Sequence, residues 1–269
     1  MGDRKSLIKK LLIFMIVMGL ISLVFMLLSS YKENNNKMYI DVDTMELVQL
    51  EEPEEGDPIA VINTSLGEIR MVLYPEYAPN AVKNFTELAE SGYYDNTYVF
   101  HSEDGVYAAA GSKTKDGTMP EGYDESRELV ERELHQNLWP FRGAVCCLTT
   151  TVDAGIKEAI LGGETYYCGS RFALINTVEF NDEFKAELIE SSESEELANA
   201  FIENGGIPNF SQQMTIIGQT YKGFDVIEAL ASLEVEDPEN ETSKIPKEDV
   251  MIISVEIGEY SEAEENLSE

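Results

Sequence analysis

Histidine and cysteine, which often serve as acid–base groups, nucleophiles or metal ligands, are scarce in this chain of 269 residues. It contains two histidines, His101 and His135, and three cysteines, Cys146, Cys147 and Cys168. Zinc and similar metals need several Cys or His ligands at short, regular spacings, and no such spacing occurs here. The sequence therefore predicts neither a metal site nor a cofactor, and we expect His135, in an acidic stretch, to face solvent.

The odd number of cysteines allows at most one internal disulfide. Cys168 could pair with one of the adjacent Cys146 and Cys147, because the stretch between them is typical of an excursion between two strands. Three small thiols, buried or idle, are the alternative. Both interpretations stay open at this point.

The charge of the chain is strongly acidic and unevenly distributed. Six of the 19 Lys and Arg and two of the 51 Asp and Glu lie in residues 1–37, which leaves 13 basic and 49 acidic residues, a net charge of −36, for residues 38–269. Such a field repels phosphate backbones, so nucleic acid is excluded as a partner. An apolar content of 43% still provides for a folded core.

A stretch of 21 uncharged residues, Leu11–Tyr31, follows the basic residues Arg4, Lys5, Lys9 and Lys10. As a helix it would span roughly 30 Å, the thickness of a hydrocarbon core. The preceding basic residues place the N-terminus in the cytoplasm and the rest of the chain outside it. We therefore predict a single-pass signal-anchor, with a cleaved signal peptide as the alternative.

The remaining boundaries follow from composition. A low-complexity, acidic stretch is typical of a mostly solvated stalk, although the apolar content of residues 38–50 leaves a short strand or helix open there. The acidic C-terminal end is typical of a frayed tail. The predicted organisation is a basic cytoplasmic segment at 1–10, a transmembrane helix at 11–31, an acidic stalk at 32–57, a folded domain at 58–260 with an insertion at about 182–204, and an acidic tail at 261–269.

The folded domain is predicted to be mostly β. A hairpin at 59–74 is followed by a helix that begins at Pro79 and ends near Gly92, and a second amphipathic helix covers 225–233. Many short strands with two separated helices favour a closed antiparallel barrel capped by helices, since closure removes exposed edges. The insertion fits one or two acidic surface helices. The other predicted strands are 97–101, 106–110, 143–149, 171–177, 214–219 and 250–257.

Several motifs occur in order along the domain. Leu73-Tyr74-Pro75-Glu76-Tyr77-Ala78-Pro79 precedes Gly92-Tyr93-Tyr94-Asp95 and Phe100-His101, and Asn204-Gly205-Gly206-Ile207-Pro208 precedes Gly223-Phe224-Asp225. Together they resemble the cyclophilin-type peptidyl-prolyl isomerases over nearly all of 58–257. The resemblance implies an eight-stranded antiparallel barrel capped by two helices, in agreement with the strand and helix pattern.

The resemblance also implies isomerisation of Xaa-Pro peptide bonds. Rotation about this bond faces a barrier of roughly 18–20 kcal/mol, because amide resonance must be broken. Catalysis needs a pocket for the proline ring and a donor aimed at the prolyl nitrogen as it loses conjugation. In the family this donor is an arginine directly after the Phe-His pair, and here the residue is Ser102.

Other positions of the family's site are replaced as well. The resemblance places the substrate groove at Tyr107, Ala108, Ala110, Leu148, Thr149, Ala173, Asn209, Phe210 and Met214. Of these, only Tyr107 and Phe210 keep even the rough character of the family's residues. Loss of one transition-state donor costs about 10²–10³ in rate, so weak or absent activity on short Xaa-Pro peptides is expected.

The predicted catalytic residues are Arg171, His101 and Ser102, and each has a second interpretation. Arg171 lies on a predicted strand beside the site and could replace the missing guanidinium, whose fixed charge and planar fork suit a donor. It could equally pair with one of the many acids. His101 resembles the family's histidine beside the site, with a structural role as the alternative.

Two functions are compatible with this pattern. One is a membrane-anchored, extracytoplasmic proline isomerase that assists the folding of exported, proline-containing polypeptides. The other is a cyclophilin-like chaperone or peptide-binding module without rate enhancement. In both, the acidic surface favours basic clients.

Overall fold

The computed structural model describes residues 38–118, 129–151, 166–192, 194–240 and 242–265. These residues belong almost entirely to one compact unit, which comprises Tyr39–Thr150 and Tyr166–Glu269. The predicted cytoplasmic segment 1–10, the membrane helix 11–31 and the first stalk residues, 32–37, lie outside the described residues. Within the part of the chain that is described, no helix combines the length and hydrophobicity that crossing a bilayer requires.

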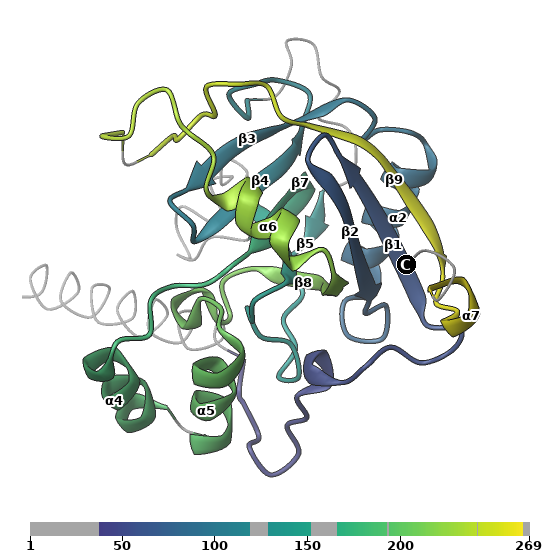
Figure 1. Cartoon of the computed structure of the whole chain (residues 1–269). Coiled ribbons are helices and arrows are strands. Elements are labelled where there is room, and N and C mark those ends of the chain that lie inside the picture. The colour runs from purple at the N-terminus through teal and green to yellow at the C-terminus, as the bar shows by residue number, and fades with distance from the viewer. Residues whose placement is uncertain (1–37, 119–128, 152–165, 193, 241, 266–269) are drawn as a thin grey trace, which may run out of the picture. The chain divides into compact units, whose positions relative to one another are not determined.

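The domain is a closed antiparallel barrel, as predicted (Figure 1). Its strands lie in the order β4-β3-β9-β1-β2-β8-β6-β7, and β7 pairs with β4 to close the ring. A further two-residue strand, β5, pairs with Tyr167 and Cys168 near the start of β7. The strands are β1 (Pro58–Thr64), β2 (Gly67–Leu73), β3 (Thr97–Glu103), β4 (Tyr107–Ser112), β5 (Val130–Glu131), β6 (Ala144–Thr151), β7 (Tyr166–Ile175), β8 (Thr215–Lys222) and β9 (Met251–Glu259).

Two helices contribute to the core inside the barrel. Helix α2 (Pro79–Glu90) buries its predicted face, including Phe85 and Leu88, and α6 (Phe224–Ala231) buries Ile227 and Leu230. Their side chains join the inward residues of the strands in one cluster. The barrel is therefore filled and capped by the two helices whose amphipathic patterns the sequence contains.

The N-terminus of α2 is completed by a residue that sequence reasoning missed. The residue before the helix, Ala78, offers no side-chain cap. Instead the carboxylate of Glu133 accepts hydrogen bonds from the backbone N–H groups of Asn80, at 3.1 Å, and Ala81, at 2.9 Å. A negative charge at this position satisfies free amide groups and complements the helix dipole.

The acidic insertion consists of two helices, α4 (Asp182–Ser191) and α5 (Glu195–Asn204), as predicted. Asn181 and Ser194 cap them by accepting hydrogen bonds from Phe184 and Leu197. The helices pack on a separate apolar cluster, which we call the insertion core. Its buried members are Trp139, Phe141, Leu197, Ala200 and Phe201, with Ile40, Met45, Leu47, Phe180 and Leu188 packed against them.

Part of the predicted stalk is docked on the domain. Residues 39–47 contribute to the insertion core, and a 3₁₀ turn, η1 (Val48–Leu50), follows. Within it Gln49 is only 4% exposed. Its amide donates to Gln219 at 2.9 Å, and its carbonyl oxygen accepts from the backbone N–H of Trp139. Residues 39–50 of the predicted stalk are thus docked on the domain, and their helical turn is one of the two alternatives left open for this stretch.

The first residues of the predicted acidic tail are docked too, and they form a short helix, α7 (Glu262–Glu265). Glu265 accepts hydrogen bonds from Arg70 at 2.6 Å and from the Tyr221 hydroxyl at 2.9 Å. It also lies 3.6 Å from the Lys222 ammonium. Fraying is therefore wrong for this end of the chain up to residue 265, because β2 and β8 together offer a cationic surface for one carboxylate.

The three cysteines are buried as free thiols, which is the second of the two alternatives. Cys146 belongs to an apolar cluster on the outer face of the barrel, whereas Cys147 and Cys168 lie in the main core. The Cys168 thiol donates to the hydroxyl of Thr215 at 3.2 Å. Burial raises the pKa of Cys146 above its usual range, so this thiol is unreactive.

The contribution of the insertion core to the stability of the protein can be tested by truncating Phe201. The ring is 2% exposed and lies 4.6 Å from the ring of Phe141. Phe201→Ala should lower the free energy of unfolding by about 3–5 kcal/mol, since truncating a buried aromatic removes transfer free energy and leaves a cavity. Urea unfolding measures this, and Ile189→Ala, at a position 42% exposed in the same insertion, should change stability by less than about 0.5 kcal/mol. Equal effects of the two changes would contradict a packed insertion core.

Candidate functional site

Three rings in contact run from β3 across β4 to a 3₁₀ turn, η2 (Pro208–Phe210). The imidazole of His101 stacks on Tyr107, with the ring centroids 5.3 Å apart and the planes at 19°. Tyr107 meets Phe210 edge to face, with the centroids 5.6 Å apart. The structure thus brings together three residues that the sequence assigned to the site.

Tyr107 and Phe210 belong to a larger apolar group on the outside of the barrel, which we call the outer cluster. Its buried members include Cys146, Ala173 and Ile175. Partly buried side chains from several elements pack against them, and these include Leu148 and Met214. Five predicted substrate-binding residues therefore share one surface: Tyr107, Leu148, Ala173, Phe210 and Met214.

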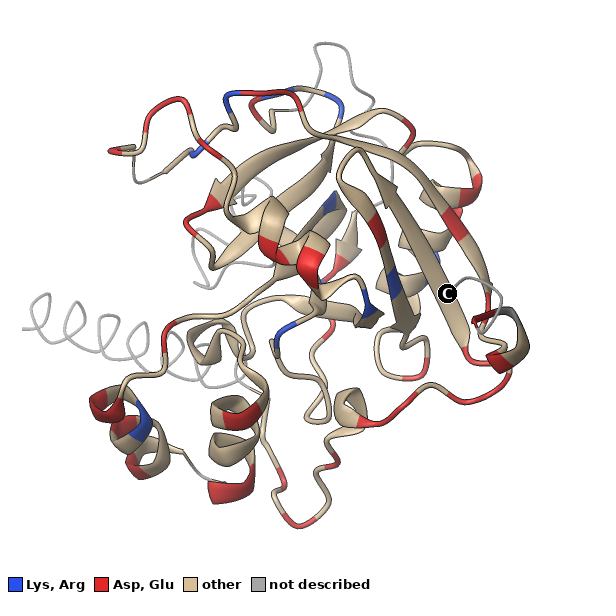
Figure 2. Cartoon of the chain, viewed as in Figure 1, with Lys and Arg blue, Asp and Glu red and all other residues tan. Residues whose placement is uncertain are grey.

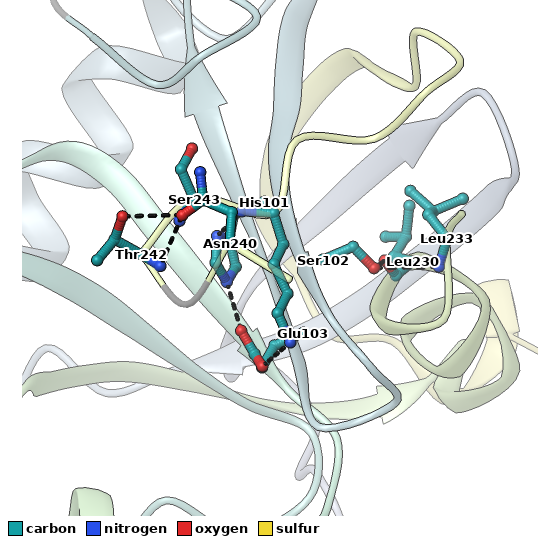
Figure 3. A network of polar contacts seen from close by, with 9 residues as sticks. His101, Ser102, Glu103, Leu230, Leu233, Asn240, Thr242 and Ser243 are labelled. Carbon is teal, nitrogen blue, oxygen red and sulfur yellow. Dashed lines mark hydrogen bonds and ion pairs between the residues drawn. The ribbon is translucent and has the colours of Figure 1, made fainter. Parts of the chain in front are cut away.

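Ser102 is separated from this surface. It is 1% exposed, and its hydroxyl donates to the carbonyl of Leu230 at 2.9 Å and accepts from the N–H of Leu233 at 3.0 Å. Figure 3 shows Ser102 directed to the end of α6, away from His101 and Glu103. A donor aimed at a substrate must face the groove, so the groove-side position on β3 belongs to His101 and not to Ser102.

A bulge in β3 explains why His101, and not the next residue, Ser102, faces the outer cluster. The β3–β4 register pairs Val99 with Ala110 and His101 with Ala109, which leaves Phe100 without a partner. Because side chains on a strand alternate between faces, one extra residue exchanges the inward and outward positions that follow it. The alignment of Ser102 with the family's arginine placed this residue on the wrong face.

The same alternation separates the alanines of β4. Ala108 and Ala110 are both fully buried in the main core, so their side chains do not line the outer cluster. Ala109, between them, lies opposite His101 on one side and Ala173 on the other. Sequence reasoning missed Ala109, although the two-residue period of a strand starting from Tyr107 indicates it.

Both ring nitrogens of His101 are occupied. Nδ1 accepts a hydrogen bond from the backbone N–H of Lys244 at 3.2 Å, and Nε2 lies 3.0 Å from a carboxylate oxygen of Glu103. Since Nδ1 accepts, the proton is on Nε2, which donates to Glu103. The side chain of Lys244 completes the group by donating to the other oxygen of Glu103 at 2.6 Å.

Glu103 and Lys244 were not predicted as site residues. Lys244 follows a turn in which the Asn240 side chain accepts hydrogen bonds from Thr242 and Ser243. The carbonyl of Lys244 also accepts the N–H of Ser102 at 3.0 Å, which holds this segment along β3. Lys244 is 143 positions from His101 in the chain, so no local pattern connects the two.

Arg171 is held by the backbone and not by an acid. One of its guanidinium N–H groups donates to the carbonyl of Gly117 at 2.7 Å. Among the described residues no carboxylate forms an ion pair with it, unlike the predicted alternative. Arg171 precedes Ala173 by two residues on β7 and so lies on the same face of the sheet, while its backbone is roughly 13 Å from Ile175, the residue that pairs with Tyr107.

Three other residues that the sequence singled out differ in their exposure. Asn209 is exposed, and Thr149 is half-buried on β6 next to Leu148. His135 is half-buried instead of exposed, with its ring centroid 4.5 Å from that of Tyr77, and burial lowers its pKa. In the described ranges, no three His, Cys, Asp or Glu residues lie close enough to hold a metal ion.

Comparison with known proteins gives consistent matches. A family model described as cyclophilin type peptidyl-prolyl cis-trans isomerase/CLD matches residues 59–257. A Staphylococcus saprophyticus protein, provisionally named a peptidyl-prolyl cis-trans isomerase, is 27% identical over 212 residues, which cover 78% of this chain and 98% of that protein. A Streptococcus pyogenes protein, provisionally named a bifunctional phosphatase/peptidyl-prolyl cis-trans isomerase, is 29% identical over 215 residues, which cover 79% of this chain but only 41% of that protein.

A solved structure is similar in fold. It is a cyclophilin type peptidyl-prolyl cis-trans isomerase of Cryptosporidium parvum, determined in the presence of the dipeptide Ala-Pro. The TM-score is 0.50 and the sequence identity 20%, with 74% of this chain and 98% of that chain covered. At this identity the similarity concerns the fold alone.

The Glu103 carboxylate makes a testable contribution to stability. Burial alone would raise its pKa, but the hydrogen bonds from Lys244 and His101 outweigh burial and lower it below its ordinary value of 4.5. A lowered pKa stabilises the fold above the ordinary value, and the contribution is lost as the pH falls through the lowered one. Urea unfolding of the wild type and of Glu103→Gln should therefore differ most at neutral pH, and the difference should shrink below about pH 4.5.

Glu248→Gln is the matched control, because Glu248 is exposed and has no ion pair among the described residues. It should leave stability unchanged at both pH values. A stability difference for Glu103→Gln that did not change with pH would contradict the role of this carboxylate.

Proposed function

Because the chain belongs to the cyclophilin family of peptidyl-prolyl cis-trans isomerases, we propose that it is a membrane-anchored, extracytoplasmic isomerase with weak activity. Its substrates are Xaa-Pro bonds in exported polypeptides. The observation that carries the proposal is the outer cluster, where Tyr107, Ala173, Phe210 and Met214 meet on one face of the barrel.

The outer cluster supports binding of a proline ring. Ala173 is fully buried in this cluster, whereas Tyr107 and Phe210 are half-buried and in contact with each other. Two partly exposed aromatic rings suit a compact apolar ring, which gains most of its binding free energy from burial. The Cryptosporidium parvum relative was determined in the presence of Ala-Pro, which agrees with a proline-containing ligand here.

Weak activity follows from the missing charged donor. Ser102 bonds to α6, and Arg171 donates to the Gly117 carbonyl roughly 13 Å along β7 from the residue opposite Tyr107. A charge-assisted hydrogen bond is roughly twice as strong as a neutral one. Without it, stabilisation of the transition state decreases more than binding of the peptide does.

Anchoring and location rest on the sequence of residues 1–37. The uncharged segment 11–31 is long enough to span a bilayer, and the basic residues before it favour a cytoplasmic N-terminus. In intact cells, a protease added outside should digest the domain while the segment stays with the membrane fraction. Full protection of the domain until the cells are broken would rule this location out.

The charge distribution favours basic clients. In Figure 2 acidic residues are concentrated on α4, α5 and the segment that leads into β1, while the barrel strands are mostly uncharged. The net charge of residues 38–269 is −36. Such a field raises the local concentration of cationic segments without contributing to the chemistry.

A binding module without rate enhancement is the second candidate, and the burial of Ser102, which stands where the family has its arginine, favours it. The two candidates share the pocket and differ only in the transition state. Prevention of aggregation of a client, without any acceleration of its proline isomerisation, would select the second.

The test is the catalysed cis-trans exchange of a short Xaa-Pro peptide by the full chain in detergent. We expect a rate above the uncatalysed one but about 10²–10³-fold below that of an ordinary cyclophilin, since one transition-state donor is missing. Phe210→Ala should lower peptide affinity about ten-fold, because it removes one apolar wall of the pocket.

Ile253→Ala, at a position 46% exposed on β9, is the control and should change neither rate nor affinity. A wild-type rate equal to that of ordinary cyclophilins would refute weak activity. Peptide binding that Phe210→Ala leaves intact would refute the position of the pocket.

A further inference from the structure

Tyr107 presents a hydroxyl at the outer cluster with no hydrogen-bond partner among the described residues. The side chain is half-buried, and its oxygen is not among the enclosed polar atoms that lack a partner. The hydroxyl is therefore open to a ligand. We propose that Tyr107 donates the hydrogen bond to the prolyl nitrogen during isomerisation, an assignment that rests on the proposed function.

The ring that carries this hydroxyl is held on two sides. His101 stacks on one face at 5.3 Å, and Phe210 makes an edge contact at 5.6 Å. The imidazole is fixed in turn by hydrogen bonds to Glu103 and to the backbone of Lys244. A donor whose direction is set before the substrate binds costs little reorganisation in the transition state. Glu103 and Lys244 are thus positioning residues for Tyr107.

The other candidate donors are engaged elsewhere. The Ser102 hydroxyl is bound to Leu230 inside the barrel. The Nε2–H group of His101 donates its hydrogen bond to Glu103. One N–H group of Arg171 donates to Gly117, and the backbone of Arg171 lies four residues before Ile175, which pairs with Tyr107. The phenol of Tyr107, by contrast, belongs to the outer cluster and has no hydrogen-bond partner among the described residues.

The chemistry requires only a neutral donor. As the C–N bond rotates, the nitrogen lone pair leaves amide conjugation and becomes able to accept a hydrogen bond, and no covalent bond forms or breaks. Burial and the nearby Glu103 raise the pKa of Tyr107, so the phenol keeps its proton at neutral pH. A neutral O–H stabilises this nitrogen less than a guanidinium does, which agrees with weak activity.

Tyr107→Phe isolates the hydroxyl because it keeps the ring and its contacts. In the peptide exchange assay with the full chain, kcat/KM should fall about ten-fold, the loss expected for one neutral hydrogen bond. The dissociation constant of the peptide, measured by calorimetry, should stay within two-fold. Tyr98→Phe is the matched control: Tyr98 is half-buried on the neighbouring strand β3, and its hydroxyl also has no partner among the described residues.

The outcomes separate the donor from the function. Wild-type exchange with an unchanged rate in Tyr107→Phe overturns the donor and leaves the isomerase function standing. A loss in Arg171→Ala with none in Tyr107→Phe assigns the donor to Arg171. A fall in peptide affinity that accounts for the whole loss makes Tyr107 a wall of the pocket only. No acceleration by the wild type at all overturns the proposed function and the donor with it.

Discussion

The pairing of β4 with β7 is the constraint on which the candidate site depends. It closes the barrel, and the same register sets Tyr107 opposite Ile175 and Ala109 opposite Ala173. Residues 64 and 68 positions apart in the chain thus become neighbours through backbone pairing. A slip of one residue in this pairing would turn every side chain of β4 to the other face, so the closure of the fold and the assembly of the outer cluster are one event.

A single bulged residue determines what β3 presents to that surface. With Phe100 unpaired, His101 faces the outer cluster and Ser102 faces α6. The inward serine ties the end of α6 to β3, and the outward histidine supports the aromatic wall. One irregularity of the ladder therefore divides a structural role and a site role between consecutive residues.

The order of strands and helices was predictable, because the hydrophobic periods of the barrel and of α2 and α6 are strong and the family motifs occur in sequence. Tyr107, Ala173, Phe210 and Met214 were placed at the site for the same reason. The faces of Ser102, Ala108 and Ala110 were not predictable, since a bulge has no signature in the residue types here. The contacts of Lys244 with His101 and of Glu133 with α2 depend on tertiary approach, which no local pattern encodes.

If the chain is anchored as proposed, the docking of residues 39–50 against the insertion core limits the distance between the domain and the membrane. Under the proposed anchoring, only residues 32–38 would remain as a free tether, and seven extended residues reach at most about 25 Å. The outer cluster would then stay close to the membrane surface. A domain tethered in this way would meet polypeptides as they emerge from the bilayer, so the place and time of export would determine which clients it contacts.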